Sequence, residues 1–317
     1  MAWRKTTLPA RALVAVLFAA ASAGLAQAPV PPPATTVIGR DLVFARAGEK
    51  NLTLDLYRPA NRPRNLPVVV WIYGGAWRTR NRVPQATKAS WLATHGYAVA
   101  VIDYRLSSEA LFPAQINDCK AAVRWLRANA AKFGLDADHI GAWGESSGGH
   151  LASLLGVTGG VPDLEGDPGN AGTSSRVSAV VDFFGPTDFV QMDAHALPNA
   201  TLKHNSPSSP ESQLVGGPIQ ENIQRVARAN PLTYVTKAAP PFLIVHGEQD
   251  LLVPVHQSEL LFAALKNAQT DVTFYKIADA GHSGAAFYNE MMHAAVLAFF
   301  DKHLKPTQNS DLLPPGP

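Results

Sequence analysis

Cysteine is almost absent from this sequence. Cys119 is the only one in 317 residues, which excludes an internal disulfide. Charged residues are also few, at 16% of the chain, and the formal net charge of +2 provides no basic field of the kind that binds nucleic acid. Hydrophobic residues, in contrast, make up 46% of the chain, which is enough to bury a large core.

The sequence also lacks an apolar run that would span a bilayer comfortably. Its N-terminus is basic and continues into the short apolar segment Ala12–Ala26, a pattern typical of an export signal. We therefore predict a signal peptide over residues 1–28, with the mature chain beginning between Gly24 and Pro29. The expected location is periplasmic or secreted, without stable membrane association once the leader is removed. A retained membrane anchor is the alternative.

The rest of the chain indicates a single catalytic domain over residues 37–306, preceded by a Pro-rich linker at 29–36 and followed by a flexible tail at 307–317. Continuous apolar runs such as Leu66–Gly75 and Tyr97–Arg105 alternate with helical patterns. Runs of this kind are typical of strands that are buried on both faces. The alternation predicts an α/β fold whose sheet is mostly parallel and covered by helices on both sides.

Eight strands are expected in this sheet, and the first two pair antiparallel. Two segments rich in Gly, Pro, Asn and Ser interrupt the regular pattern, at Gly156–Arg176 and Asp188–Tyr234. We expect them to form a small cap insertion, because they are too short for a large lid domain.

A glycine-rich stretch joins a predicted strand to a predicted helix. Gly144-Glu145-Ser146-Ser147-Gly148 matches G-x-S-x-G, the tight turn that raises a serine hydroxyl above a sheet. The residues two before and two after the serine crowd each other, so both must be small. Centring the turn on Ser146 places Gly144 and Gly148 there, whereas centring it on Ser147 places Glu145 there. Ser146 is therefore the candidate nucleophile, and the backbone N–H of Ser147 is expected to face an oxyanion.

A nucleophilic serine needs a histidine base and a carboxylate that orients it, in the chain order serine, acid, histidine. His282, in the loop after the last predicted strand, is the candidate base. The loop after the preceding strand offers Asp250 and Glu248, and Asp250 is favoured because it lies further out. The other histidines precede or abut the serine, precede the acid, or lie in the insertion or in helices: His95, His139, His150, His195, His204, His246, His256, His293 and His303.

The loop after the strand that begins at Leu66 is also glycine-rich. Gly75 and Ala76 are expected to direct their backbone N–H groups at the substrate oxygen. Trp77, Tyr73 and Glu145 are candidates for the wall of the substrate pocket. Such a site needs neither a metal nor an organic cofactor.

These segments, which run from about Leu66 to His282, resemble the α/β-hydrolase superfamily. They include "VVVWIYGGAW", "IGAWGESSGGHLASLLG", "PFLIVHGEQDLLVP" and "AGHSG". The resemblance is to esterases and lipases with an H-G-G-x-W oxyanion loop, including bacterial feruloyl-esterase-like and kynurenine-formamidase-like enzymes. It implies that Ser146, Asp250 and His282 form a catalytic triad. It also implies that the backbone N–H groups of Gly75, Ala76 and Ser147 are the oxyanion donors.

One position departs from this family, because Tyr73 stands where the relatives have histidine. We expect the Tyr73 hydroxyl to hold the oxyanion loop in place without taking part in proton transfer. Asp103 and Arg105, in the "DYR" that follows the next strand, are expected to connect loops structurally.

The predicted function is an exported serine carboxylesterase that hydrolyses small to medium esters, with aryl or feruloyl-type esters among the candidate substrates. The only expected partner is a small-molecule ester, and the sequence leaves the oligomeric state open. The alternatives are an arylformamidase, a serine peptidase of the prolyl oligopeptidase kind, and an inactive hydrolase-fold binding module.

Overall fold

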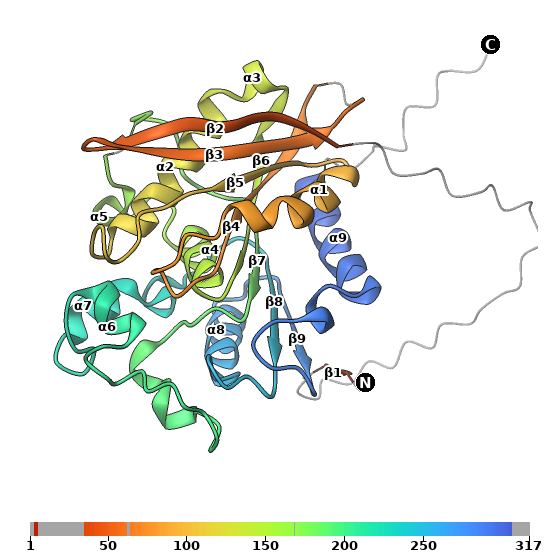
Figure 1. Cartoon of the computed structure of the whole chain (residues 1–317). Coiled ribbons are helices and arrows are strands. Elements are labelled where there is room, and N and C mark those ends of the chain that lie inside the picture. Colours follow the sequence, from red (N-terminus) through yellow and green to blue (C-terminus); the bar gives the residue numbers. More distant parts are fainter. Residues whose placement is uncertain (1–2, 6–34, 62–63, 168, 306–317) are drawn as a thin grey trace, which may run out of the picture.

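The centre of the structure, a computed structural model, is one twisted sheet (Figure 1). The structure describes residues 3–5, 35–61, 64–167 and 169–305. Along the sheet the strand order is β1-β9-β8-β7-β6-β4-β5-β3-β2. The strands are β1 (Trp3–Lys5), β2 (Thr35–Ala47), β3 (Lys50–Pro59), β4 (Leu66–Ile72), β5 (Ala98–Ile102), β6 (Leu135–Glu145), β7 (Ala179–Phe183), β8 (Phe242–Gly247) and β9 (Val272–Ile277).

The sheet is parallel from β5 through β4, β6, β7 and β8 to β9. At one edge, β2 and β3 are antiparallel to their neighbours. The predicted eight-stranded, mostly parallel sheet is thus confirmed in β2–β9. At the other edge the structure adds β1, which pairs antiparallel with β9 and was not expected because it falls within the predicted signal peptide.

Most of the predicted leader and linker, and the tail at 307–317, lie outside the described residues. The linker predicted at 29–36 extends too far, because Thr35 and Thr36 already belong to β2. None of the helices in the described part of the chain combines the length and the apolar character of a membrane span.

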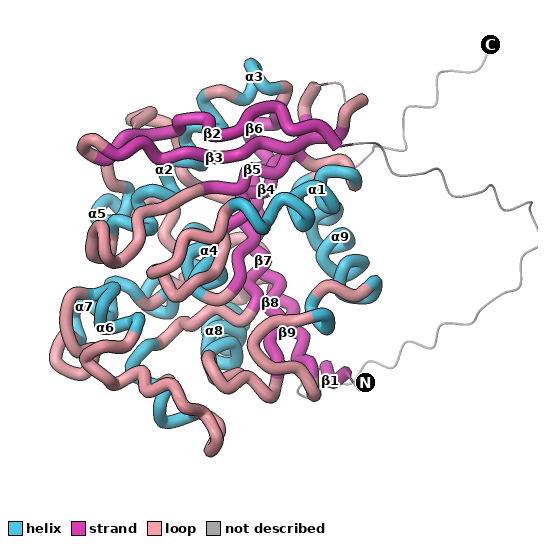
Figure 2. Tube along the Cα trace, in the orientation of Figure 1, coloured by secondary structure: helices cyan, strands magenta, loops and turns pink. Residues whose placement is uncertain are grey.

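Helices cover both faces of the sheet, as the apolar pattern predicted (Figure 2). On β4, Val68 and Val70 pack into the core shared with α2, α4 and α8, whereas Val69 and Trp71 pack into the core shared with α1 and α9. Because side chains alternate along a strand, a strand buried on both sides must be apolar throughout. The α-helices are α1 (Ala86–Thr94), α2 (Ala114–Ala128), α3 (Ala130–Phe133), α4 (Ser147–Val157), α5 (Pro162–Glu165), α6 (Pro210–Val215), α7 (Ile223–Ala229), α8 (His256–Asn267) and α9 (Glu290–Leu304).

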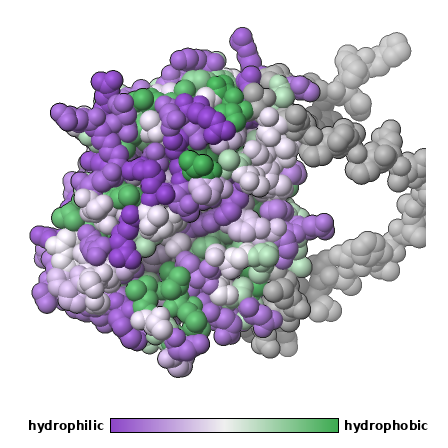
Figure 3. Space-filling model, in the orientation of Figure 1, coloured by the Kyte–Doolittle hydropathy of each residue, from purple (hydrophilic) through white to green (hydrophobic). Residues whose placement is uncertain are grey.

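The two predicted insertion segments consist mainly of loops with the short helices α5, α6 and α7 (Figure 2). Short 3₁₀ turns complete the fold: η1 (Val83–Gln85), η2 (Phe189–Gln191), η3 (Asp193–His195), η4 (Pro231–Tyr234) and η5 (Ala285–Phe287). On the face drawn in Figure 3, most of the surface is hydrophilic and the hydrophobic residues form separate patches.

The turn between β6 and α4 is the most crowded point of the sheet edge. Ser146 adopts φ 54° and ψ −124°, a backbone conformation that is costly for a residue with a side chain. A Cβ atom on Gly144 would overlap the backbone of Gly148, and one on Gly148 would overlap the carbonyl of Ile72. The crowding inferred from the G-x-S-x-G spacing is therefore present, and it falls around Ser146.

We expect Gly144→Ala to destabilise the protein by about 1–3 kcal/mol, because the added methyl group meets backbone atoms that have no room to retreat. Urea denaturation measures this difference. Gly281→Ala is the matched control, since a Cβ atom there meets its nearest neighbour at 3.6 Å, an ordinary contact. Equal stability of the two variants would contradict the crowding.

Candidate active site

Three loops at the carboxyl ends of parallel strands bring Ser146, His282 and Asp250 together, as parallel α/β sheets commonly do. The Ser146 hydroxyl lies 2.9 Å from Nε2 of His282, and Nδ1 of His282 lies 2.7 Å from Oδ2 of Asp250. The three residues follow β6, β9 and β8 respectively. Glu248, the carboxylate that was not favoured, lies 4.0 Å from Lys276 on the outer side of the loop.

The Asp250 carboxylate is buried, at 1% exposure, and its oxygens are well supplied with donors. Oδ1 accepts the backbone N–H groups of Leu252 and Val253 at 2.8 and 2.9 Å. Oδ2 also faces Nε2 of a second histidine, His246, at 3.1 Å. Burial alone would raise the pKa of Asp250, but the hydrogen bonds from His246 and His282 outweigh it and lower that pKa. Asp250 is thus held as a carboxylate beside His282.

A small cavity of about 80 Å³ opens beside Ser146. Of the predicted oxyanion and pocket residues, Ala76, Ser147 and Trp77 line it. The full set of lining residues is Ala76, Trp77, Ser146, Ser147, Pro186, Leu202, His204, Pro210, Glu211, Leu252, Val253 and His282. The cap insertion therefore supplies one wall of the cavity.

Three predicted residues do not line this cavity. Gly75 is set back from it, with φ 138°, a conformation that favours glycine. The Tyr73 side chain is fully buried and turns away from Ser146, so its interpretation as a pocket-wall residue is wrong. Glu145 forms an ion pair with Lys88 at 2.6 Å and a short hydrogen bond with Tyr288, and it too is not part of this wall. The sequence analysis placed the side chains of Tyr73 and Glu145 wrongly, because proximity to a motif does not fix the direction in which a side chain points.

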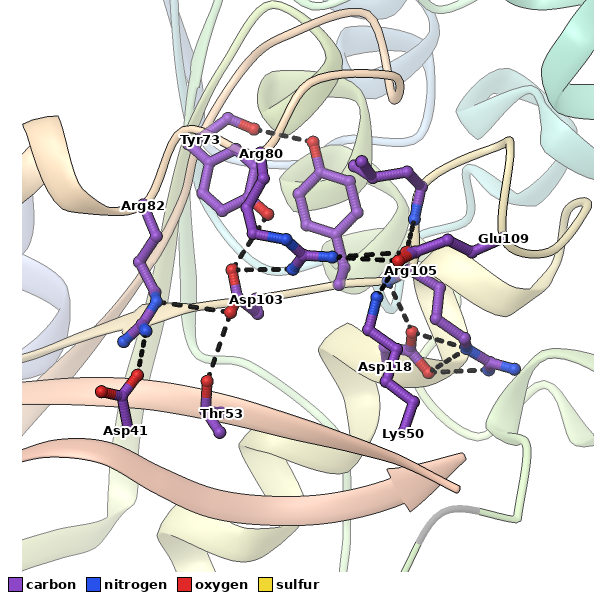
Figure 4. A network of polar contacts seen from close by, with 12 residues as sticks. Asp41, Lys50, Thr53, Tyr73, Arg80, Arg82, Asp103, Arg105, Glu109 and Asp118 are labelled. Atoms are coloured by element: carbon purple, nitrogen blue, oxygen red, sulfur yellow. Dashed lines mark hydrogen bonds and ion pairs between the residues drawn. The ribbon is translucent and has the colours of Figure 1, made fainter. Parts of the chain in front are cut away.

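Tyr73 instead contributes to a network that holds the oxyanion loop. Its hydroxyl donates to Oδ1 of Asp103 at 3.1 Å, and Arg80, at the far end of the same loop, contacts the same oxygen at 3.1 Å (Figure 4). Burial, followed by the nearby Tyr104 and Asp103, raises the pKa of Tyr73, so its hydroxyl keeps its proton and acts as a donor. Oδ2 of Asp103 contacts Arg82 at 3.4 Å. One carboxylate therefore fixes both ends of the loop.

The structural role predicted for the "DYR" segment is confirmed. Asp103 connects the oxyanion loop to β3, because it also accepts the hydroxyl of Thr53 at 3.2 Å. Arg105 binds Asp118 of α2 at 2.7 Å (Figure 4). Tyr104, between them, is buried and donates to the carbonyl of Tyr73 at 3.0 Å.

The middle of the oxyanion loop is held from another direction. Ala76 and Trp77 both have φ 54°, which needs support from their surroundings. The Trp77 indole N–H donates to Nδ1 of His150 at 3.2 Å, and Nε2 of His150 donates to the carbonyl of Ala229 at 2.7 Å. Burial lowers the pKa of His150 to about 4, which keeps the ring neutral and its Nδ1 free to accept. A buried histidine thus links the oxyanion loop to α4 and to the cap insertion.

Sequence reasoning set aside the histidines that turned out to surround the site. His150 was excluded as a base for its place in the helix, and His246 for preceding the acid, yet both hold other site residues in place. His204 of the insertion lines the cavity together with Glu211. The spacing of His246, four residues before Asp250, is a signal that could have suggested a contact.

The sheet, its helices and the turn at Ser146 define an α/β-hydrolase fold. The BD-FAE family model matches residues 54–265, more than half of the sequence. The chain therefore belongs to the BD-FAE family.

Solved structures agree with this assignment. A truncated form of a carbohydrate esterase from gut microbiota is 35% identical, with a TM-score of 0.77 over 87% of this chain and 99% of its own. A bifunctional GH43-CE protein of Bacteroides eggerthii is 40% identical, with a TM-score of 0.75 over 83% of this chain and 38% of its own.

The probable carboxylic ester hydrolase LipM of Mycobacterium tuberculosis is 34% identical over 240 residues, which is 74% of this chain and 53% of LipM. The chain therefore spans about half the length of this curated relative.

We expect Tyr73→Phe to lower kcat about tenfold with little change in KM, because it removes the hydroxyl that fixes the loop to Asp103 and leaves the ring in place. Steady-state kinetics on a short ester measures both constants. Tyr234→Phe is the matched control, since that hydroxyl donates to the carbonyl of Arg228 within the insertion. An unchanged kcat in Tyr73→Phe would contradict the hypothesis that the Tyr73 hydroxyl holds the oxyanion loop in place.

His150 predicts a pH dependence of stability. Unfolded, it takes up a proton near pH 6.5, whereas in the folded protein it does so only near pH 4. Its contribution is therefore complete above pH 6.5 and is lost as the pH falls towards 4. His150→Gln keeps a donor and an acceptor but cannot be protonated.

Between about pH 7.5 and about pH 4.5, the free energy of unfolding should fall by about 2 kcal/mol more in the wild type than in His150→Gln. Urea denaturation at the two pH values gives this difference, and the groups common to both proteins cancel. If the free energies of unfolding of the two proteins changed equally with pH, His150 would take up its proton at the same pH in the folded and the unfolded protein, which would contradict the prediction.

Proposed function

We propose that this protein is a serine hydrolase that cleaves short-chain carboxylic esters. The observation that carries the proposal is the continuous chain of hydrogen bonds from Asp250 through His282 to Ser146, at the mouth of a small cavity. The related carbohydrate esterase and LipM, whose names describe ester hydrolysis, support it.

In the proposed mechanism, Nε2 of His282 takes the proton of Ser146 as its oxygen attacks the ester carbonyl. Asp250 holds the ring through Nδ1 and stabilises the positive charge that forms on it. His282 then protonates the leaving alcohol, and water repeats the sequence on the acyl-enzyme. The strained turn at Ser146 supports this assignment, because it presents the hydroxyl to His282 and to the cavity.

The negative charge that develops on the carbonyl oxygen needs donors fixed in advance. We propose the backbone N–H groups of Gly75, Ala76 and Ser147 for this role, each contributing roughly 3 kcal/mol. The anchoring of the loop by Asp103 and His150 supports the proposal, since donors that must reorient give less stabilisation.

The size of the cavity favours a short acyl or alcohol group. At about 80 Å³, it holds between two and three times the volume that one water molecule occupies in the liquid. A feruloyl group is far larger, so we propose acetyl and similar short esters in place of the feruloyl-type esters suggested by the sequence. The solved relative named as a carbohydrate esterase supports acetylated sugars as the proposed substrate class.

Export also stays a proposal. The basic start of the chain and the apolar segment Ala12–Ala26 support it. An extracytoplasmic enzyme of this kind would meet esters of the cell's surroundings.

Ser146→Ala should lower kcat on 4-nitrophenyl acetate by roughly 10⁵-fold, because it removes the nucleophile. Ser147→Ala should stay within about threefold of the wild type, because the proposed role of Ser147 uses its backbone N–H. A fluorophosphonate probe followed by peptide mass spectrometry should find the label on Ser146. Labelling of Ser147, or activity in Ser146→Ala, would overturn the assignment of the nucleophile.

Acyl length tests the proposed substrate size. Across 4-nitrophenyl acetate, butyrate and octanoate, we expect kcat/KM to fall at least about tenfold from the shortest to the longest ester, because the cavity cannot enclose the longer chains. Methyl ferulate should be a poor substrate in comparison with methyl acetate. Preference for octanoate or ferulate would show that the acyl group binds outside this cavity.

A further inference from the structure

The cavity beside Ser146 contains a second polar centre that the proposed reaction does not use. His204 and Glu211, both from the cap insertion, line it together with Ser146 and His282, and they are only 2% and 3% exposed. Nδ1 of His204 lies 3.1 Å from Oε1 of Glu211, so the two form a buried ion-pair contact. Burial of a carboxylate costs free energy because it removes the hydration of the charge, so a buried carboxylate needs partners that compensate for this loss.

This pair is incompletely satisfied. Oε2 of Glu211 and Nδ1 of His204 have no hydrogen-bond partner among the described residues. Buried polar atoms in folded proteins nearly always have partners, so an unpartnered carboxylate oxygen in a substrate cavity indicates a place for a donor that arrives with the substrate.

The pair is also held rigidly. Nε2 of His204 donates to the carbonyl of Leu252 at 2.9 Å, and its backbone N–H donates to Asp193 at 2.8 Å. Burial disfavours the charged form of His204, but the adjacent Glu211 carboxylate outweighs it and raises the pKa of His204. Glu211 follows Ser209, whose side chain caps the start of α6. His204 is therefore fixed by two hydrogen bonds, and Glu211 lies in contact with it.

Five further residues that line the cavity have apolar side chains: Pro186, Leu202, Pro210, Leu252 and Val253. In such surroundings a hydrogen bond to a carboxylate is strong, and a substrate group that cannot form it is disfavoured.

We propose that Glu211, positioned by His204, is a specificity residue that accepts a hydrogen bond from a free hydroxyl group of the ester substrate. The inference rests on the proposed esterase function and deepens it. The favoured substrates are short acyl esters of polyhydroxy alcohols, in which a free hydroxyl lies close to the ester bond. The cavity is small, so a group that reaches Glu211 from an ester at Ser146 is only a few atoms long.

The test compares matched esters with and without free hydroxyl groups. Glycerol 1-monoacetate is matched with propyl acetate, and a monoacetylated methyl xyloside with cyclohexyl acetate, which separates glycerol esters from sugar esters. The wild type should show a kcat/KM at least about tenfold higher on the hydroxylated member of one or both pairs. Equal values within both pairs would overturn the proposal without any variant.

Glu211→Gln keeps the shape of the side chain and removes its charge. It should lower kcat/KM on the preferred hydroxylated ester about tenfold and leave the plain ester within about twofold. Glu221→Gln makes the same change at an exposed position of the insertion and should alter neither. An equal loss on both members of a pair would show a purely structural role for Glu211 and overturn the inference.

Melting temperatures identify a variant that fails to fold. In that case the comparison of matched esters with the wild-type enzyme tests the proposal. The two proposals fail in different ways. A wild type that hydrolyses none of the esters contradicts the proposed function itself. A wild type that hydrolyses them all without preference contradicts only the role of Glu211.

Discussion

The site depends on the strained turn at Ser146. Its positive φ occurs where β6 and α4 meet so closely that Gly144 and Gly148 have no room for side chains. That close approach raises the hydroxyl above the sheet, where the loops after β8 and β9 can reach it. The strain is offset by the large cores on both sides of the sheet, which fix the ends of the turn.

Around this turn, buried polar groups hold what glycine-rich backbone cannot hold by itself. Asp103 contacts both ends of the oxyanion loop, and His150 supports its middle through Trp77. His246 supports Asp250 at Oδ2, the same oxygen that His282 contacts. In each case a side chain that takes no part in the proposed chemistry fixes a loop or a side chain that does, which preorganises the site before substrate arrives.

The cap insertion adds the part of the cavity wall to which we assign selection of the substrate. It closes the cavity to about 80 Å³ and places Glu211 and His204 in its wall. The carboxyl edge of the sheet thus carries the triad residues, and the insertion carries the pair to which we assign recognition. Loops of this kind can change without disturbing the sheet.

The sequence by itself determined the order of strands and helices in the main domain, because strands buried on both faces must be apolar throughout and strand-to-helix turns need small residues. It also determined that the tight turn is centred on Ser146 and not on Ser147, since glycine spacing is a local property. Only the tertiary structure decided where Tyr73 and Glu145 point, and which histidines contact Asp250 and Trp77. Those contacts join segments far apart in the chain, and the direction of a side chain across a packed core is set by its neighbours rather than by its position in a motif.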